Sequence, residues 1–321
     1  MMGGGASTSD ERRTISAGVV ALALIVATAA PAASLYKYRG PGGEWIYADR
    51  PPADETAVEI RELASRDDDP EVIVSQRLDE GSLHLEASNG YHAPVELVFG
   101  IDAMSNAMPL PPDQPLRFVL PALGAIDLFA LAPSEAGLEP TIRYRYTWIA
   151  GDPLSEHRPE QPYRVPFAVA ASFPVSQAFP DAITHNTPDS RYAVDISMPV
   201  GTNVYAARGG VVFEVASTHF RGSTDPADAP EANLVRILHE DGTYAVYAHL
   251  NWNTIRVRPG DVVDRGEYIA DSGDTGFTSG PHLHFAVLHN RGMAIESLPV
   301  VFEGANGSEV VPRTGMKLTA Y

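Results

Sequence analysis

The sequence predicts a mainly β protein with three β regions in series: an N-terminal β-hairpin module, a β-sandwich-like middle domain and a C-terminal antiparallel β domain. Short runs in which apolar and polar residues alternate recur along the chain, as at 83–87, 95–99 and 142–148, and turn residues separate them. In the C-terminal part no segment shows the sustained 3.6-residue apolar repeat that an amphipathic helix needs. Together these observations favour antiparallel sheets.

The composition narrows the possible classes of function. The 321 residues include 41 acidic and 23 basic side chains, which gives a net charge of -18. A nucleic-acid-binding protein needs a Lys- and Arg-rich face to neutralise phosphates, so this balance argues against nucleic acid as a partner. The chain contains no cysteine, which excludes disulfides, cysteine nucleophiles and thiolate metal sites. Any metal must therefore be held by His, Asp or Glu.

Residues 1–33 have the features of a secretory signal peptide. Arg12 and Arg13 precede an uncharged, mostly apolar run from 15 to 30, and Ala30-Pro31-Ala32 fits an A-x-A cleavage site. The run is about 16 residues long, shorter than the ~20 that a membrane-spanning helix needs, which favours cleavage over an uncleaved anchor. We therefore expect export to a bacterial periplasm or cell envelope, or secretion, with no transmembrane segment after removal of the signal.

The first mature segment, 34–52, is predicted to form a β-hairpin because two aromatic, alternating runs flank a Gly/Pro turn. With Tyr36-Lys37-Tyr38 and Ala48-Asp49-Arg50-Pro51-Pro52 it resembles a small exported domain of unknown function, a likeness that implies no chemistry. The polar, acidic stretch 53–70 is predicted to be a linker. The next region, 71–166, has the strand pattern of a β-sandwich without a cluster of His or acidic residues, so we interpret it as a spacer or docking module.

Histidines and glycines concentrate after residue 167. His282 and His284 are separated by one residue in a predicted strand, so both side chains point to one side and Leu283 to the other. His249 ends another strand-like run, and Asp195 lies in an apolar run where a carboxylate is expensive to bury unless it is paired or bound to a cation. Taken singly, each has an ordinary alternative: a strand-end histidine for His249 and a turn-capping carboxylate for Asp195.

Together these pieces resemble the M23 zinc metallopeptidases, the lysostaphin- and LytM-like peptidoglycan endopeptidases, over about residues 168–303. The resemblance implies a LytM-like antiparallel β catalytic domain with one zinc ion per chain. Asp195 and His284 would be zinc ligands, and His249 and His282 would flank the metal as catalytic residues. The matching motifs follow in order: Val200-Gly201-Thr202, Ala206-Ala207-Arg208-Gly209-Gly210, Tyr247-Ala248-His249-Leu250, Val257-Arg258-Pro259-Gly260-Asp261 and Gly280-Pro281-His282-Leu283-His284-Phe285.

The third ligand of this family is a histidine that usually stands four residues before the Asp, and Arg191 occupies that position here. A variant of the family has the histidine further upstream. His185 fits that variant, with residues 186–190 as a loop that brings it back toward Asp195, so His185 is the predicted third metal ligand. The alternative is a surface-loop histidine and an incomplete site. Arg191 is interpreted as a solvated surface charge, with a role in holding a substrate carboxylate as its alternative.

Three protein ligands leave the fourth tetrahedral position of a zinc ion open to water. Zinc lowers the pKa of that water toward ~7 and polarises the scissile carbonyl. A nearby histidine can act as general base or stabilise the developing oxyanion. We assign His282 as the base and His249 as the transition-state stabiliser, although the sequence does not fix that division.

Two other features have ordinary explanations. Asp271-Ser272-Gly273 and Asp274-Thr275-Gly276 each look like an aspartic-protease motif, but they lie three residues apart, which favours a turn. The Asp-, Ala- and Pro-rich stretch 217–232 is either a wall of the substrate cleft or a mobile surface insertion.

The predicted function is an exported zinc metalloendopeptidase that hydrolyses peptide bonds in peptidoglycan stem or cross-link peptides through a zinc-activated water. Peptidoglycan peptides are the expected partners, with other envelope proteins as further ones. The alternatives are a catalytically inactive LytM-like regulator that activates another cell-wall hydrolase, and a wall-binding module. The predicted organisation is a signal peptide (1–33), a β-hairpin module (34–52), a linker (53–70), a β-sandwich domain (71–166), an M23/LytM-like metallopeptidase domain (167–304) and a loose tail (305–321).

Overall fold

The computed structural model describes residues 13–16, 34–39, 45–48, 59–62 and 70–321, the first four ranges as strands only. The chain falls into two compact units, one within residues 18–71 and one that contains residues 72–321. The predicted signal peptide lies outside the described residues apart from strand β1 (Arg13–Ser16), which pairs with β10. In the described part of the chain, no helix is long and apolar enough to cross a membrane.

The N-terminal unit contains the predicted hairpin and one further strand. Strand β2 (Ser34–Arg39) pairs antiparallel with β3 (Trp45–Ala48). On its other edge β2 pairs with β4 (Glu59–Glu62), so the sheet has three strands. The stretch predicted to be a linker therefore contributes a strand, which the polar composition of 53–70 did not indicate.

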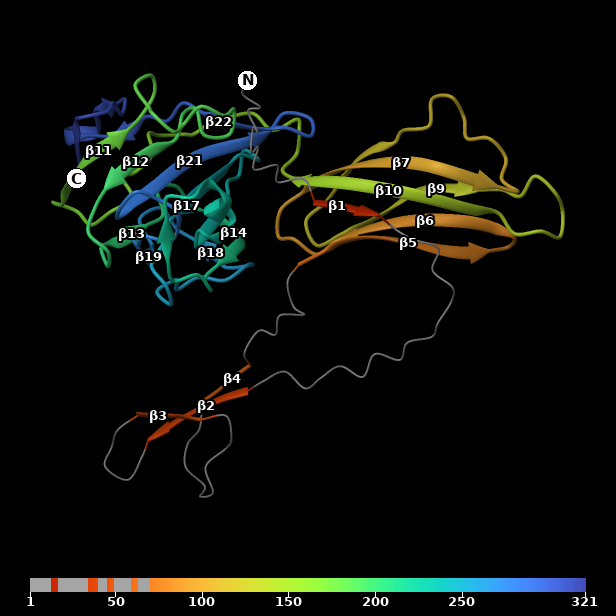
Figure 1. Cartoon of the computed structure of the whole chain (residues 1–321), viewed down its shortest axis with the longest axis horizontal. Coiled ribbons are helices and arrows are strands. Elements are labelled where there is room, and N and C mark those ends of the chain that lie inside the picture. The colour runs from red at the N-terminus through yellow and green to blue at the C-terminus, as the bar shows by residue number, and fades with distance from the viewer. Residues whose placement is uncertain (1–12, 17–33, 40–44, 49–58, 63–69) are drawn as a thin grey trace, which may run out of the picture. The chain divides into compact units, whose positions relative to one another are not determined.

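The middle region forms two antiparallel sheets (Figure 1). One sheet contains β5 (Val72–Asp79), β6 (Ser82–Asn89) and β9 (Ala125–Leu131), and the other contains β7 (Val95–Ser105), β8 (Arg117–Leu120) and β10 (Thr141–Ala150) together with β1. Alternate residues such as Leu85 and Leu97 are fully buried between the sheets, as the period of a half-buried strand requires. The hydroxyl of Tyr144 donates to the carbonyl of Val74 across the two sheets, at 3.1 Å.

The C-terminal region is built on a nine-stranded antiparallel sheet. Its strands run in the order β18 (Val262–Val263), β14 (Gly210–Ala216), β16 (Leu234–Leu238), β17 (Tyr244–Ala248), β21 (His282–Asn290), β12 (Val194–Ser197), β11 (Ser172–Gln177) and β25 (Lys317–Thr319), and β22 (Ile295–Leu298) also pairs with β21. The smaller elements are β13 (Asn203–Tyr205) with β19 (Tyr268–Asp271), β15 (Gly222–Ser223) with β20 (Gly276–Phe277), β23 (Phe302–Glu303) with β24 (Glu309–Val310), and the 3-10 helices η2 (Pro226–Glu231) and η3 (Ala305–Gly307). These strands confirm the mainly β fold.

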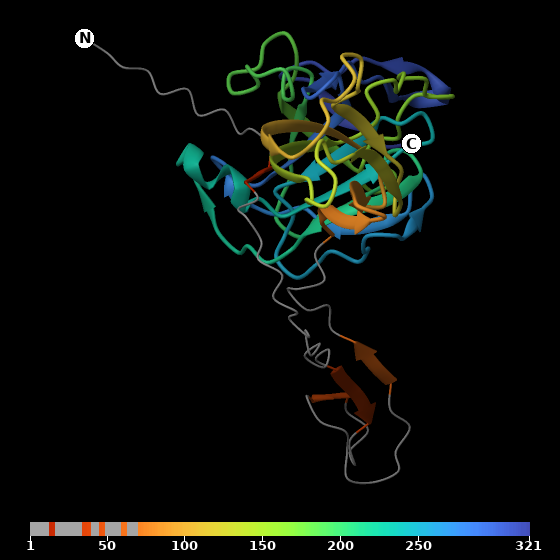
Figure 2. The same cartoon turned by 90° about the vertical axis from the view of Figure 1, so that its right-hand side faces the viewer.

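The predicted loose tail is wrong for its last residues. Strand β25 pairs with β11, and Leu318 and Ala320 are buried in the core of the C-terminal region. The stretch 217–232 is also ordered: β15 pairs parallel with β20 and is followed by η2 (Figure 2, teal). Both segments have little apolar pattern of their own. Partners far away in the sequence hold them in place, so the local pattern did not indicate their structure.

The sandwich and the C-terminal sheet share one hydrophobic cluster. Tyr91 and Trp148 of the sandwich region lie in the same cluster as Phe213, Tyr244 and Leu288 of the sheet. Leu288 is four residues after His284 in β21 and therefore projects from the same face of that strand. One face of β21 thus carries the predicted site at its beginning and packs in the shared cluster further along.

Candidate metal centre

Strand pairing places Asp195 beside His284. In the antiparallel register of β12 and β21, Asp195 lies directly opposite His284, and Ser197 lies opposite His282. The neighbouring side chains Ile196 and Leu283 point the other way and are fully buried in the core. Because side chains alternate along a strand, burial of those neighbours directs the carboxylate and both imidazoles to the opposite face. The predicted common orientation of His282 and His284 is therefore present.

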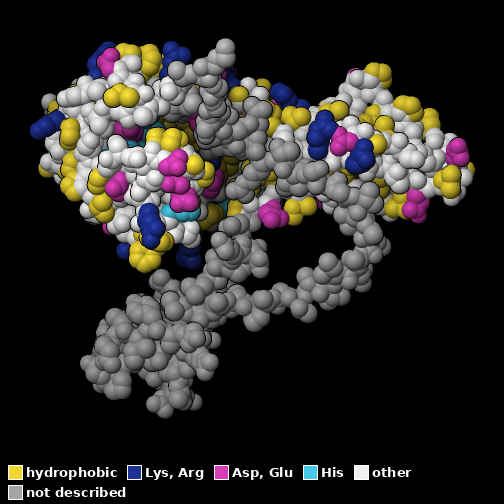
Figure 3. Space-filling model, viewed as in Figure 1, with side chains coloured by type: hydrophobic (Ala, Val, Ile, Leu, Met, Phe, Trp, Pro, Cys, Tyr) yellow, Lys and Arg dark blue, Asp and Glu magenta, His cyan; other side chains and the backbone are white. Residues whose placement is uncertain are grey.

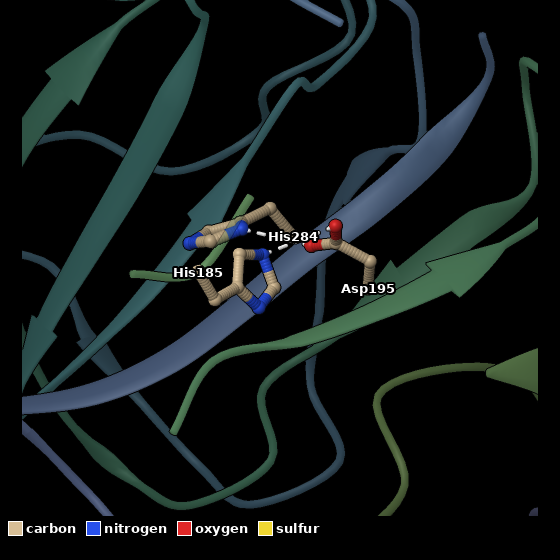
Figure 4. Close-up of side chains that lie close together, drawn as sticks. All are labelled: His185, Asp195 and His284. Atoms are coloured by element: carbon tan, nitrogen blue, oxygen red, sulfur yellow. Dashed lines mark hydrogen bonds and ion pairs between the residues drawn. The ribbon is translucent and has the colours of Figure 1, made fainter. Parts of the chain in front are cut away.

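His185 reaches the same point from the loop between β11 and β12 (Figure 4). Its Nε2 lies 3.1 Å from Asp195 Oδ2, and the Nδ1 of His284 lies 2.9 Å from Asp195 Oδ1. The Nδ1 of His185 donates to the carbonyl of Ala193 at 3.2 Å, which turns Nε2 toward the carboxylate. One ligand atom from each of His185, Asp195 and His284 lies within 4.8 Å of the other two. The structure thus brings the three predicted ligands together.

The carboxylate of Asp195 is charged and almost enclosed. Its side chain is only 5% exposed, and in the described part of the chain its ion pairs are all with histidines: His185, His282 and His284. Burial by itself raises the pKa of Asp195, but hydrogen bonds with His185 and His284 outweigh it and hold the pKa well below its usual range. The site therefore presents a buried negative charge surrounded by imidazole nitrogens.

His249 and His282 form a second pair beside the first three residues. Their ring centroids are 4.5 Å apart, and His282 Nε2 lies 3.8 Å from Asp195 Oδ1. The Nδ1 of His249 donates to the carbonyl of Thr275 at 2.7 Å, and the Nδ1 of His282 donates to the carbonyl of Gly280 at 2.8 Å. Since a carbonyl only accepts, each neutral ring carries its proton on Nδ1 and has a lone pair on Nε2.

The backbone and burial of His249 are unusual for a strand-end residue. Its φ of 60° lies in the left-handed region, which few residues other than glycine adopt. Burial, with His282 and His284 as like-charged neighbours, lowers the pKa of His249 to about 3. The ring is therefore neutral at pH 7. Because Nδ1 donates to Thr275, Nε2 of the neutral ring is an acceptor.

Arg191 takes no part in the cluster. It is exposed, and its guanidinium lies 5.4 Å from the ring centroid of Phe179 and 5.6 Å from that of Tyr192. The two aspartic-protease-like motifs also serve local structure: Asp271 Oδ1 accepts from Tyr268 and Asp274 Oδ1 from Thr278. These contacts agree with their interpretation as surface and turn residues.

One contact of the site has no signal in the sequence. Gln177, the last residue of β11, lies with its Nε2 2.8 Å from Asp195 Oδ2. Nothing in the pattern of β11 distinguishes this glutamine from any polar residue at a strand end. A common face with Asp195 follows only from the pairing of β11 with β12.

Comparison with known proteins finds a family match within the C-terminal region. Residues 189–296 match the sequence model of peptidase family M23. Lysostaphin of Staphylococcus simulans is 31% identical over 139 residues, which are 40% of this chain and 26% of lysostaphin. The glycyl-glycine endopeptidase ALE-1 of Staphylococcus capitis is 30% identical over 139 residues, 41% of this chain and 35% of ALE-1. The peptidoglycan DD-endopeptidase ShyA of Vibrio cholerae is 36% identical over 94 residues, 29% of this chain and 19% of ShyA.

These matches cover the C-terminal region alone. The chain spans about a third or less of the length of these relatives, and His185 lies just before the residues that the family model matches. The place of His185 at the site therefore rests on the geometry described above. The matched segment contains Asp195, His249, His282 and His284 in the order that the motifs predicted. The C-terminal region thus resembles peptidase family M23 over residues 189–296.

Proposed function

We propose that the chain is an exported zinc metalloendopeptidase that hydrolyses peptide bonds in the stem or cross-link peptides of peptidoglycan. The observation that carries the proposal is the convergence of His185, Asp195 and His284, from a loop and two neighbouring strands, on one enclosed point within an M23 domain. The relatives support peptidoglycan as the substrate, since their names describe a glycyl-glycine endopeptidase and a peptidoglycan DD-endopeptidase.

The donor set suits zinc. Two imidazoles and one carboxylate are a usual ligand set of catalytic zinc sites, which keep a further position open. His185 also shows why a cation fits: Nδ1 donates to Ala193, so the contact of Nε2 with Asp195 needs either a second proton or a metal ion between the two groups. A metal ion supplies the positive charge that the enclosed carboxylate otherwise obtains only from imidazole protons. We therefore propose about one zinc ion per chain.

Zinc, when bound, polarises a carbonyl group and lowers the pKa of water. The remaining steps belong to the side chains. His282 is proposed as the general base, because its Nε2 has a lone pair and lies 3.8 Å from Asp195 Oδ1. In this role Nε2 takes up a proton from the attacking water. That proton can then pass to the nitrogen of the leaving group.

His249 is proposed as the second catalytic residue, with a role that differs from the one predicted. Its neutral ring, held by Thr275, accepts a hydrogen bond at Nε2. That position suits an N–H of the substrate or the attacking water, which the ring would orient toward His282. A donor to an oxyanion would have to carry a second proton, which the low pKa of His249 disfavours.

Export and partners belong to the same proposal. Export rests on the signal-like features of residues 1–33. The net charge of -18 disfavours electrostatic attachment to an anionic wall, and the face of the described chain in Figure 3 has scattered acidic and basic side chains rather than a continuous basic patch. We therefore propose that contacts at the metal centre or with the N-terminal β regions select peptidoglycan peptides, with other envelope proteins as further partners.

The rival proposal is a metal-free regulator of another cell-wall hydrolase or a wall-binding module. It requires that the metal site be incomplete, and Arg191 at the usual ligand position is its main support. The retention of Asp195, His249, His282 and His284 in one cluster favours the enzyme.

Zinc content separates the two proposals. We expect the purified wild-type chain to hold about one zinc ion and to release peptides from peptidoglycan sacculi, and His185→Ala to lose or strongly weaken both properties. His84→Ala, which changes a histidine of the sandwich strand β6, is the matched control and should behave as the wild type. A wild-type protein without zinc and without activity on sacculi would overturn the proposed function.

A further inference from the structure

The side-chain amide of Gln177 connects Asp195 with the loop that carries His185. Its Nε2 donates to Asp195 Oδ2 at 2.8 Å. Its Oε1 accepts hydrogen bonds from the backbone N–H groups of Ile183 at 2.8 Å and Thr184 at 2.9 Å. Since a backbone N–H can only donate, these two bonds require the amide oxygen to face the loop and the amide nitrogen to face the carboxylate.

The second N–H of the amide is also used. Nε2 lies 2.9 Å from the hydroxyl oxygen of Thr184, so both amide protons and the amide oxygen of Gln177 have partners. The ladder between β11 and β12 is irregular between Val175 and Gln177, and this irregularity places Gln177 opposite Asp195. Such irregularities redirect a side chain out of the regular alternation of a strand.

We propose that Gln177 is a positioning residue of the metal centre, which fixes the rotation of the Asp195 carboxylate and fastens the loop that delivers His185. The inference rests on the proposed function, because it treats His185 and Asp195 as ligands. The hydrogen bonds described for Gln177 go to Asp195, Ile183 and Thr184, so its effect on His185 and His284 is transmitted through the loop and the carboxylate.

The length of the loop explains why such a fastening is needed. His185 precedes Asp195 by ten residues, whereas the usual ligand position is four residues before the Asp. A longer connection has more conformations to lose when its end is fixed at a point. The two backbone bonds to Gln177 hold Ile183 and Thr184 directly before His185. The hydrogen bond from the same amide to Oδ2 also fixes the orientation of the Asp195 carboxylate toward the two imidazoles.

The test is the zinc dissociation constant of the full chain, measured by competition with a chromogenic chelator. Partners that hydrogen-bond a metal ligand typically contribute 10–100-fold in metal affinity, so Gln177→Met should weaken zinc binding by about 10–100-fold. The matched control is Thr184→Val, which removes the hydroxyl beside Gln177 and keeps the bonds from the amide to Asp195 and to the loop backbone. It should change zinc affinity by less than about threefold.

Gln177→Asn serves as a second variant, since it keeps a polar amide at the strand end and shortens its reach by one methylene group. It should also weaken zinc binding, so the inference can be tested even if Gln177→Met does not fold. At saturating zinc the KM for a peptide substrate should stay near that of the wild type in both variants, because Gln177 is proposed to act on the ligands alone.

Three results would overturn the inference. The first is wild-type zinc affinity in Gln177→Asn or in a folded Gln177→Met. The second is an equal loss in Thr184→Val, which would indicate a general effect on the loop. The third is a wild-type chain that binds no zinc, which would overturn the proposed function as well. The first two results leave the proposed function intact, so the two failures are distinguishable.

Discussion

Two buried carboxylates, Asp195 and Glu96, have different kinds of partner. Glu96, whose side chain is fully buried, accepts from the side-chain amide of Asn290 at 2.8 Å and from the backbone N–H of Met293 at 2.7 Å. The guanidinium of Arg117 lies 3.3 Å from its other oxygen. Glu96 therefore has a permanent cation and donors that cannot lose their protons.

Asp195 has no such permanent cation among its described partners. It is surrounded by imidazoles, which are cationic only when protonated, and by the single amide of Gln177. Buried charges are tolerated when they are paired or coordinate a metal. The comparison indicates that Glu96 is a structural carboxylate, which joins the sandwich to the end of β21, whereas Asp195 is suited to exchange imidazole protons for a metal ion.

The largest expected effect distinguishes these two carboxylates directly. Asp195→Asn should weaken zinc binding by more than about 100-fold, beyond the range of residues that only support a ligand, because a neutral amide replaces the charged ligand. Peptide release from sacculi should fall to background. Zinc content after gel filtration and an activity assay on sacculi provide the measurement. Zinc binding at wild-type strength would show that Asp195 is structural like Glu96.

Glu96→Gln should have the opposite profile. Replacing a fully buried, paired carboxylate leaves Asn290 and Met293 with a poorer partner, so we expect a loss of about 3 kcal/mol in the free energy of unfolding. Zinc affinity should remain that of the wild type, since the change lies at the far end of β21. Chemical denaturation and chelator competition measure the two quantities. Loss of zinc binding in folded Glu96→Gln would contradict the separation of the two roles.

Asp241 provides a second example of the structural kind. It is nearly buried, Arg208 Nη1 lies 2.6 Å from its Oδ2, and the hydroxyl of Thr243 donates to Oδ1 at 2.6 Å. Burial alone raises its pKa, but bonds from Thr243, Arg208 and the Arg158 backbone lower it well below the usual range. Its contribution to stability is therefore present above the unfolded pKa of about 3.9 and is lost as the pH falls through the lower folded pKa.

Asp241→Asn should therefore reduce the free energy of unfolding by about 2 kcal/mol at pH 7, which is the usual contribution of hydrogen bonds to a charged group. The difference from the wild type should shrink as the pH falls below about 4, because Asp241 of the unfolded wild-type chain then takes up a proton while the folded carboxylate stays charged. Denaturation curves from pH 3 to 7 test this. A difference that stays constant over this range would show that the charge of Asp241 is not the cause.

The sequence predicted those parts of the site that depend on strand period and motif order. His282 and His284 share a face because alternate residues of a strand do so. The burial of Leu283 in the core confirms that the residue between them points the other way. The register that sets Asp195 opposite His284 is a property of two strands far apart in the sequence, and the sequence joined these two residues only as ligands implied by the family resemblance. Gln177 could not be predicted, since its contacts depend on an irregular pairing and on the path of a loop.

The same distinction applies to the fold. Alternating apolar residues predicted the sandwich and the C-terminal sheet, whereas β25 has three residues and no pattern of its own. Its place follows from pairing with β11 and from the burial of Leu318. Strand β4 is short and polar, and it is a strand only because β2 offers it an edge. Apolar alternation predicts strands that bury one of their own faces. Strands that form only by pairing with the edge of a strand far away in the sequence lack this alternation.

The smallest expected effect concerns Arg191, which stands where most of the family has a histidine ligand. Its exposed guanidinium lies against Phe179 and Tyr192 rather than toward Asp195, so Arg191→Ala should reduce the free energy of unfolding by only about 0.5–1 kcal/mol. Zinc affinity and activity should stay within about twofold of the wild type, below the change expected for any residue that supports a ligand. Thermal denaturation and chelator competition test both values.

A large loss of peptide hydrolysis at unchanged zinc affinity would instead assign Arg191 to the substrate, as a cation that holds a peptide carboxylate. Unchanged activity would leave Arg191 with a stacking role at the surface.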